Sequence, residues 1–267
     1  MDRAQKGHGM KIATFNINGV KARAEVLGRW LDQSAPDAAV LQEIKSVDEN
    51  FPREIIESRG YHLETHGQKG FNGVAILSKL PLNNVVRRLP GNSDDDHARW
   101  IEADIGETGL RLCGLYLPNG NPAPGPKYDY KLAWMERMHA RVQALLKTEK
   151  PLVFAGDYNV IPQPADAARP SAWTDDALFR PDTRAAFRRL ENLGLYDALR
   201  LRHPEPGIYS FWDYQAGAWA RNDGIRIDHL MLSAQAADRL TDAWVETDPR
   251  AWDKPSDHTP VWIDLSL

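Results

Sequence analysis

The sequence is poor in cysteine, with one residue, Cys113, in a chain of 267. A disulfide framework is therefore impossible, and the chain is suited to a reducing compartment. Cys113 lies in an apolar run over residues 110–117 that is typical of a strand, which predicts a small core residue rather than a catalytic thiol. A chain of this length buries enough apolar surface to fold without cross-links or a structural metal.

Long apolar stretches are also missing. No segment approaches the roughly 20 apolar residues that cross a bilayer, and the chain begins without the apolar centre of a secretory signal. Residues 1–9 are polar and contain glycine, and a second methionine follows at Met10, which predicts a disordered leader or a cloning remnant over 1–9. Since no linker or low-complexity run divides the remainder, we expect residues 10–267 to form a single catalytic domain in the cytoplasm.

An excess of basic charge is the third absence. The chain has 33 Lys and Arg against 37 Asp and Glu, a formal net charge of −4 and a pI near 6.1. This balance argues mildly against avid, non-specific binding of nucleic acid, which usually rests on a basic surface. It does not exclude DNA, because a cluster of catalytic acids lowers the total and a basic footprint can be local.

The apolar pattern switches repeatedly between short runs and helical spacing. Helices are predicted over residues 21–33, 51–59, 127–147 and 182–193. Strands are predicted over residues 11–17, 38–44, 61–66, 73–78, 99–104, 110–117, 151–155, 209–212, 225–232, 242–247 and 260–266. Hairpins mixed with helices favour an α/β fold of two mixed sheets packed face to face, with helices outside. Patterning alone does not settle that architecture.

Polar residues of one chemical kind follow the predicted strands, where rigid scaffolds usually carry site residues. In chain order they are Asn16, Glu43, Tyr116, Asp157, Asn159, Asp228, Asp257 and His258. Each also has an ordinary explanation: Asn16 could serve a turn, Glu43 could pair with Lys45 on the surface, and Tyr116 could be plain core. Their joint occurrence in one chain is what indicates a site.

These residue types suit hydrolysis of a phosphodiester. Oxygen ligands from Glu43, Asn16 and Asp257 suit Mg²⁺, which binds substrate phosphate directly and stabilises its charge. A histidine held by a carboxylate, here His258 with Asp228, supplies an oriented donor or base near neutral pH.

The remaining polar residues suit the attack itself. Asp157 could orient or deprotonate the attacking water, and Asn159 and Tyr116 could donate hydrogen bonds to the phosphate. The sequence has no cysteine or serine nucleophile motif that competes with this chemistry.

The segments that carry these residues resemble the successive motifs of the exonuclease III family, within the endonuclease/exonuclease/phosphatase superfamily. They are Phe-Asn-Ile-Asn-Gly at 15–19, Leu-Gln-Glu-Ile-Lys at 41–45, Tyr-Leu-Pro-Asn-Gly at 116–120, Gly-Asp-Tyr-Asn-Val at 156–160, Arg-Ile-Asp at 226–228 and Ser-Asp-His at 256–258. The resemblance runs from Met10 to the C-terminus, and the segment over 16–23 points to the bacterial DNA-repair branch.

The resemblance implies a four-layer α/β sandwich with the site at one edge, between the two sheets. Glu43 is similar to the family's principal metal ligand, supported by Asn16 and Asp257. The other roles that it implies are phosphate contact by His258 with Asp228, and water activation by Asp157 with Asn159 and Tyr116 as partners. The implied activity is Mg²⁺-dependent cleavage 5′ to abasic sites in duplex DNA, with 3′-phosphodiesterase and 3′→5′ exonuclease activity and with Mn²⁺ as a substitute.

Contacts to DNA are predicted at two places. Lys21 and Arg23 follow the Asn-Gly turn at a helix start and suit backbone phosphates, although a solvated helix end explains them as well. The residues that resemble or complete the family's pocket for the abasic sugar are Phe211, Trp212, Ile225 and Ile227. An abasic sugar has no base to stack and flips out at low cost, so an apolar pocket would accept it. Taken alone, these apolar residues are more often core.

Two rival classes stay open. A phosphodiesterase of the superfamily could act on a phospholipid or on RNA, but the sequence offers no apolar or basic membrane face. A non-catalytic DNA-binding module would not need this full set of acids, amides and a histidine. The sequence leaves open the balance of endonuclease and exonuclease activity, the number of metals, and whether His258 is base or electrophile. We expect a monomer that joins the nucleoid when bound to DNA.

Overall fold

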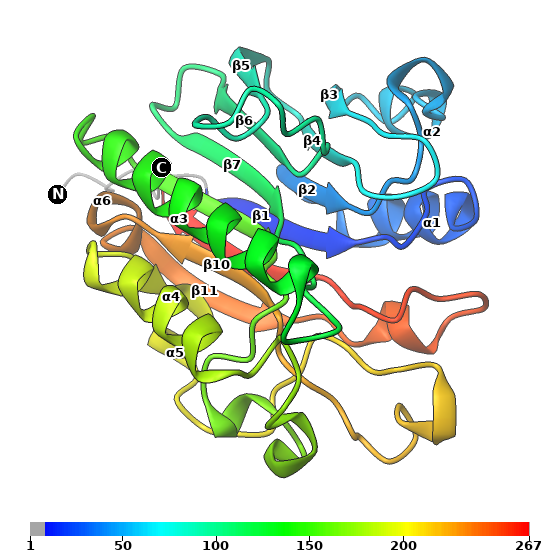
Figure 1. Cartoon of the computed structure of the whole chain (residues 1–267). Coiled ribbons are helices and arrows are strands. Elements are labelled where there is room, and N and C mark those ends of the chain that lie inside the picture. Colours follow the sequence, from blue (N-terminus) through cyan, green and yellow to red (C-terminus); the bar gives the residue numbers. More distant parts are fainter. Residues whose placement is uncertain (1–8, 267) are drawn as a thin grey trace, which may run out of the picture.

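Two six-stranded mixed sheets, packed face to face, form the centre of the computed structural model, which describes residues 9–266 (Figure 1). The first sheet has the order β11-β12-β1-β2-β4-β3. Its strands are β1 (Gly9–Asn16), β2 (Ala38–Gln42), β3 (His62–His66), β4 (Val74–Ser78), β11 (Leu240–Val245) and β12 (Val261–Ser266). The second sheet has the order β5-β6-β7-β8-β10-β9. Its strands are β5 (Leu82–Arg87), β6 (Trp100–Ile105), β7 (Arg111–Tyr116), β8 (Leu152–Asp157), β9 (Tyr196–Asp197) and β10 (Asp228–Leu232).

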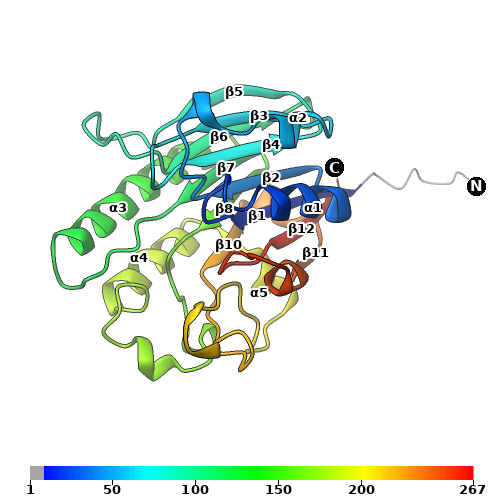
Figure 2. The ribbon, with the colours of Figure 1, turned by 90° about the vertical axis from the view of Figure 1, so that its right-hand side faces the viewer.

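Helices cover the outer face of each sheet, so the molecule has four layers (Figure 2). The longer helices are α1 (Ala24–Ser34), α3 (Pro126–Leu146) and α4 (Pro181–Asn192), and the shorter ones are α2 (Glu54–Glu57), α5 (Ala198–Arg202) and α6 (Ala234–Ala237). Aliphatic side chains such as Val40, Ile101 and Leu112 fill the space between the sheets, whereas Trp30 of α1 packs against Phe15 of β1 on the outer side of the first sheet. Both faces of the central strands are therefore buried, and the predicted four-layer α/β sandwich is confirmed.

The strand order brings the candidate residues together. β1 and β2 are parallel and pair Asn16 with Gln42, while β7 and β8 are parallel and pair Tyr116 with Asp157. β10 runs antiparallel to β8 and pairs Asp228 with Asp157. The ends of β1, β2, β7 and β8 and the start of β10 thus meet at one edge of the sandwich.

Several element predictions need correction. β5 and β9 were not expected, because β5 is largely solvent-facing and polar and β9 has two residues. The strand predicted over 209–212 is wrong: Phe211 makes isolated bridges to Ile225 and His258. β1 begins at Gly9, and residues 1–8 of the expected leader lie outside the described residues.

Two other expectations can be compared with the structure. Cys113 lies in β7 and is fully buried, as expected of a core residue. Among residues 9–266, the helices are all too short or too polar to span a bilayer.

Candidate active site

Asn16 links the two sheets at the point where the strands end. Its amide nitrogen Nδ2 donates to Glu43 Oε1 at 2.9 Å, directly after β2, and to Asp157 Oδ2 at 3.0 Å, at the end of β8. Its carbonyl oxygen Oδ1 accepts the backbone N–H of Asn18 at 3.0 Å, which fixes the orientation of the amide. Asn16 therefore faces the two carboxylates as a hydrogen-bond donor and holds them at a set separation.

The backbone around the site adopts a costly conformation at several positions. Left-handed φ angles occur at Asn18 (48°), Glu43 (50°), Lys45 (51°) and Asn159 (47°). Such residues cost on the order of 1 kcal/mol each and persist where their surroundings fix them, often at functional sites. Here the Glu43 carbonyl accepts the N–H of Gly19 at 2.7 Å, which holds the exit from β2 in place.

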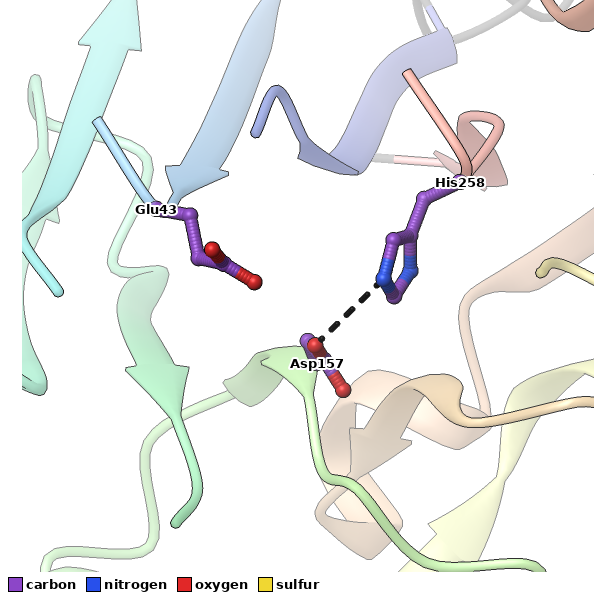
Figure 3. Close-up of side chains that lie close together, drawn as sticks. All are labelled: Glu43, Asp157 and His258. Atoms are coloured by element: carbon purple, nitrogen blue, oxygen red, sulfur yellow. Dashed lines mark ion pairs between the residues drawn. The ribbon is translucent and has the colours of Figure 1, made fainter. Parts of the chain in front are cut away.

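Glu43, Asp157 and His258 point toward one another from three separate segments (Figure 3). Their polar atoms lie within 4.8 Å of one another, and His258 Nε2 is 3.7 Å from Asp157 Oδ2. His258 Nδ1 donates to Asp228 Oδ2 at 2.8 Å, and Ser210 Oγ donates to the same oxygen at 2.6 Å. Asp228 and Ser210 thus orient the imidazole so that its Nε2 faces Asp157.

Burial and neighbouring charges shift the pKa values of these groups. Burial raises the pKa of Asp157, and the negative charges of Asp228 and Glu43 raise it further. Burial lowers the pKa of His258, but the Asp228 and Asp157 carboxylates outweigh it and raise that pKa. Burial also raises the pKa of Glu43, but hydrogen bonds from Asn16 and Lys45 outweigh it, so the Glu43 pKa is lowered. Glu43 is therefore anionic near neutral pH, while Asp157 and His258 compete for a proton.

A pocket of about 380 Å³ opens onto these groups. Its polar wall contains Tyr116, Asn119, Asn159 and Asp257 besides the three groups of Figure 3. Burial and the nearby Glu43 and Asp157 carboxylates raise the pKa of Tyr116, so its hydroxyl stays protonated and able to donate a hydrogen bond. The pocket therefore offers hydrogen-bond donors beside an anionic group, Glu43, that could hold a metal ion.

Helix α3 braces this polar wall from behind with a buried lysine. Lys131 Nζ donates to the backbone carbonyls of Asn159 at 2.6 Å and Asn119 at 3.0 Å. Asn119 Nδ2 also donates to Asn159 Oδ1 at 3.1 Å. Burial lowers the pKa of Lys131 to about 7. The Tyr-Leu-Pro-Asn-Gly and Gly-Asp-Tyr-Asn segments are thus tied together through one side chain.

The predicted polar residues all gather in this region, with different placements. Glu43, Tyr116, Asp157, Asn159, Asp257 and His258 line the pocket. Asn16 and Asp228 are fully buried behind it, each hydrogen-bonded to a residue of the wall.

The predicted DNA contacts divide into two groups. Phe211, Ile225 and Ile227 line the pocket, whereas Trp212 is 2% exposed and packs against Tyr209 and Trp219 instead. The helix expected from residue 21 begins at Ala24, so Lys21 precedes it and is exposed. Arg23 donates to the hydroxyl of Tyr214 at 3.1 Å and to the backbone carbonyl of Asn18, so its guanidinium is partly committed within the chain.

Residues that the sequence did not identify as part of the site also contribute. Trp173 and Leu178 extend the apolar wall from the loop between β8 and α4. Lys45 forms an ion pair with Glu43 at 2.9 Å, and Ser210 holds Asp228. The position of Lys45, two residues after Glu43, could have indicated that it belongs to the site, whereas no local sequence pattern marks Trp173 or Leu178.

The donor set fits a divalent cation. Carboxylate oxygens of Glu43 and Asp157 and a nitrogen of His258 lie close enough together to share an ion, and Asp257 lines the same pocket. A hard cation such as Mg²⁺ prefers oxygen ligands, and the lowered pKa of Glu43 keeps its carboxylate anionic at neutral pH.

Comparisons with known proteins agree with the geometry. Residues 13–258 match the endonuclease/exonuclease/phosphatase family. Exodeoxyribonuclease III of Haemophilus influenzae is 36% identical over 96% of this chain and 100% of that protein. An AP endonuclease structure from Archaeoglobus fulgidus is 35% identical and superposes with a TM-score of 0.92, over 97% of this chain and 100% of that one. A Neisseria 3′ phosphatase bound to a product DNA hairpin is also 35% identical, with a TM-score of 0.93 and the same coverage. The chain therefore belongs to the endonuclease/exonuclease/phosphatase family and, within it, to the exonuclease III branch that its motifs resemble.

Proposed function

We propose that this chain is a divalent-metal-dependent DNA-repair phosphodiesterase that nicks duplex DNA 5′ to abasic sites and removes nucleotides or blocking groups from 3′ ends. The observation that carries the proposal is the meeting of Glu43, Asp157 and His258 at one edge of the sandwich, within 4.8 Å. The relatives named exodeoxyribonuclease III, AP endonuclease and 3′ phosphatase support DNA as the substrate.

The metal is Mg²⁺ in this proposal, with Mn²⁺ as a substitute, and Glu43 is its principal ligand. Asn16 and Asp257 would support it, Asn16 by fixing the carboxylate or by turning its oxygen inward, and Asp257 from the same pocket. When bound, the ion would stabilise negative charge on the phosphoryl and leaving oxygens.

Side chains of this protein would orient the attacking water and accept its proton. Asp157 accepts the N–H of Asn159 at 2.9 Å and the amide of Asn16, which leaves its carboxylate aimed at the pocket for an attacking water. A raised pKa makes Asp157 a stronger base than an exposed carboxylate. His258, held by Asp228, would contact the phosphate, and Tyr116 and Asn159 would donate hydrogen bonds to it.

The apolar wall would select the substrate. Phe211, Ile225 and Ile227, extended by Trp173, line the pocket together with the catalytic groups, and the Phe211 ring packs edge-on against His258 with 4.9 Å between ring centroids. An abasic deoxyribose has no base, so it would fit against this wall once it turns out of the helix at low cost. Trp212 is not part of the wall, because it packs against Tyr209 and Trp219. Lys21 is exposed just before α1 and would contact backbone phosphate, whereas Arg23 would first need to leave Tyr214. We expect the protein to act as a cytoplasmic monomer.

The test is cleavage of a labelled duplex that carries one tetrahydrofuran abasic analogue, beside an undamaged duplex. With Mg²⁺ we expect a nick 5′ to the analogue, and with EDTA or in Glu43→Ala we expect none. Glu64→Ala is the matched control, because Glu64 of β3 pairs with Arg87 of β5 and lies outside the site. The DNA assignment would be rejected if the folded wild-type protein cleaved neither duplex but hydrolysed RNA or a phospholipid.

A further inference from the structure

The ammonium group of Lys45 stands beside the metal-binding corner of the site. Lys45 Nζ is 2.9 Å from Glu43 Oε2 and donates to Asn18 Oδ1 at 2.5 Å. Asn18 in turn donates from Nδ2 to Asp257 Oδ1 at 3.0 Å. The Lys45 ammonium therefore lies between Glu43 Oε2 and Asn18 Oδ1. The first oxygen belongs to one predicted metal ligand, and Asn18 is hydrogen-bonded to the other, Asp257.

The backbone directs Lys45 to this place. Glu43 and Lys45 both have left-handed φ angles, 50° and 51°, although neither is glycine. Hydrogen bonds from Ile44 N to Gly73 O at 3.2 Å and from Lys45 N to Asn72 O at 3.0 Å hold this bend against the neighbouring loop. Strain of this kind persists where the surroundings fix it, and here it aims both side chains at one point. A solvated surface lysine would not require it.

Lys45 and a bound metal ion would compete for the Glu43 carboxylate. Asn16 donates to Oε1 of Glu43 and Lys45 contacts Oε2, so each carboxylate oxygen already has a partner. Two cations on one carboxylate repel each other over a few ångströms, and more strongly in a partly buried corner than in water. The Lys45 side chain is 32% exposed and has a flexible four-carbon stem, so it can leave Glu43 without disturbing the fold.

We propose that Lys45 occupies the cation position beside Glu43 in the metal-free protein and moves to a substrate phosphate when a divalent cation binds Glu43. The exchange keeps the partly buried Glu43 carboxylate paired in both states, which avoids an unpaired charge in the site. It also makes Lys45 a substrate-contacting residue only in the metal-loaded protein. This inference rests on the proposed function, because it assumes Glu43 as the metal ligand.

The experiment compares Lys45→Met with Lys45→Arg and the wild type. Mn²⁺ binding is measured without DNA, from the electron paramagnetic resonance signal of free Mn²⁺, and KM for the abasic duplex is measured at saturating Mg²⁺. Lys45→Met should bind Mn²⁺ about tenfold more tightly, because the competing charge is gone, and should raise KM about tenfold, because a phosphate contact is lost. Lys45→Arg should keep Mn²⁺ binding close to that of the wild type.

Lys79→Met is the matched control, because Lys79 pairs with Asp37 outside the site and should change neither quantity. Unchanged or weaker Mn²⁺ binding by a Lys45→Met protein with a wild-type melting temperature would overturn the competition. Tighter Mn²⁺ binding with an unchanged KM would overturn the move to phosphate. If the wild type binds Mn²⁺ but cleaves no DNA, the proposed function fails while the metal-binding arm still tests the competition.

Discussion

The two walls of the catalytic pocket are built in different ways. The polar wall stands on strand ends: Asp157 ends β8, Glu43 follows β2, and Asn16, the last residue of β1, ties the two together. The apolar wall stands on long connections, with Trp173 in a 3₁₀ turn after β8 and Phe211 in the segment before β10. Under the proposed function, residues at the ends of the sheet strands would carry the chemistry and residues of the loops would select the substrate. Loop sequences could then vary without changing the catalytic groups.

A buried ionic cluster helps to fix the loops of the apolar wall, together with isolated β-bridges such as that between Phe211 and Ile225. Arg226 pairs with Asp166 at 2.7 Å and with Asp197 at 2.8 Å, and Arg200 pairs with Asp166 as well. The Nδ1 of His229 accepts a hydrogen bond from Arg226 at 2.9 Å, while its Nε2 donates to Val160 O at 3.0 Å. Asp166 and Trp173 lie in the same loop between β8 and α4, and His229 lies in β10. The cluster therefore positions the apolar wall relative to β10.

The largest expected effect lies on the polar wall. Asp157→Asn keeps the shape of the side chain and removes its charge and basicity, so kcat on the abasic duplex should fall about 10³-fold. The measurement is single-turnover cleavage, with circular dichroism to verify the fold. Binding of the uncleaved duplex should change little, because the apolar wall is intact. A loss below tenfold would mean that Asp157 does not activate the water.

Breaking the cluster behind the apolar wall should mainly reduce stability. Arg226→Met leaves Asp197 without its buried partner and should lower the free energy of unfolding by about 3 kcal/mol, measured by urea denaturation. Abasic incision should decline more than removal of undamaged 3′ nucleotides, because Trp173 loses its anchor. Arg189→Met is the control: its pair with Glu136 is exposed, so the change should stay within about 0.5 kcal/mol. Equal losses in the two variants would contradict a role for the cluster.

The same cluster predicts a loss of stability in acid. Burial, together with the positive charge of Arg226, lowers the pKa of His229 to about 4. The unfolded chain binds this proton near its ordinary pKa, so the contribution is fully present above about pH 6.5 and is lost as pH falls toward about pH 4. His229→Gln, which can keep both hydrogen bonds, should lose less stability over that window, by up to about 3 kcal/mol. Parallel unfolding curves for the two proteins would count against this assignment.

The sequence predicted the polar wall because its signals are local. Asn16, Glu43 and Asp157 each end or follow a short apolar run, and strand ends of a packed sheet meet at one edge. Lys45 was considered only as a surface partner of Glu43; the pair forms, but at the site. The position of Lys45 depends on left-handed φ angles at Glu43 and Lys45. Such angles are uncommon for residues other than glycine, so the sequence does not predict them.

The apolar wall could not be predicted in the same way. Trp173 lies in a loop without hydrophobic periodicity, and its position depends on contacts such as Asp166–Arg226, between residues that are 60 positions apart. Trp212 was misplaced for a related reason. Neighbouring aromatic residues in an irregular segment give no sign of which one faces the pocket, and here Phe211 faces it while Trp212 packs inward. β5 escaped detection because residues such as Asn83 and Asn84 give it no apolar alternation.

The smallest expected effect tests whether the apolar wall selects substrate without supporting chemistry. Trp173→Ala widens the pocket and should lower the ratio of abasic incision to 3′-nucleotide removal about tenfold, because an ordinary nucleotide is then excluded less well. The rate of chemistry at saturating abasic duplex should stay within about threefold of wild type, since Asp157 and His258 keep their supports. Tyr196→Ala is the control, an exposed aromatic that pairs with Leu232 at the far end of β10 from Asp228. If Trp173→Ala instead lowers both activities equally, the two walls are coupled, and the loop contributes to positioning the catalytic groups as well as to selecting the substrate.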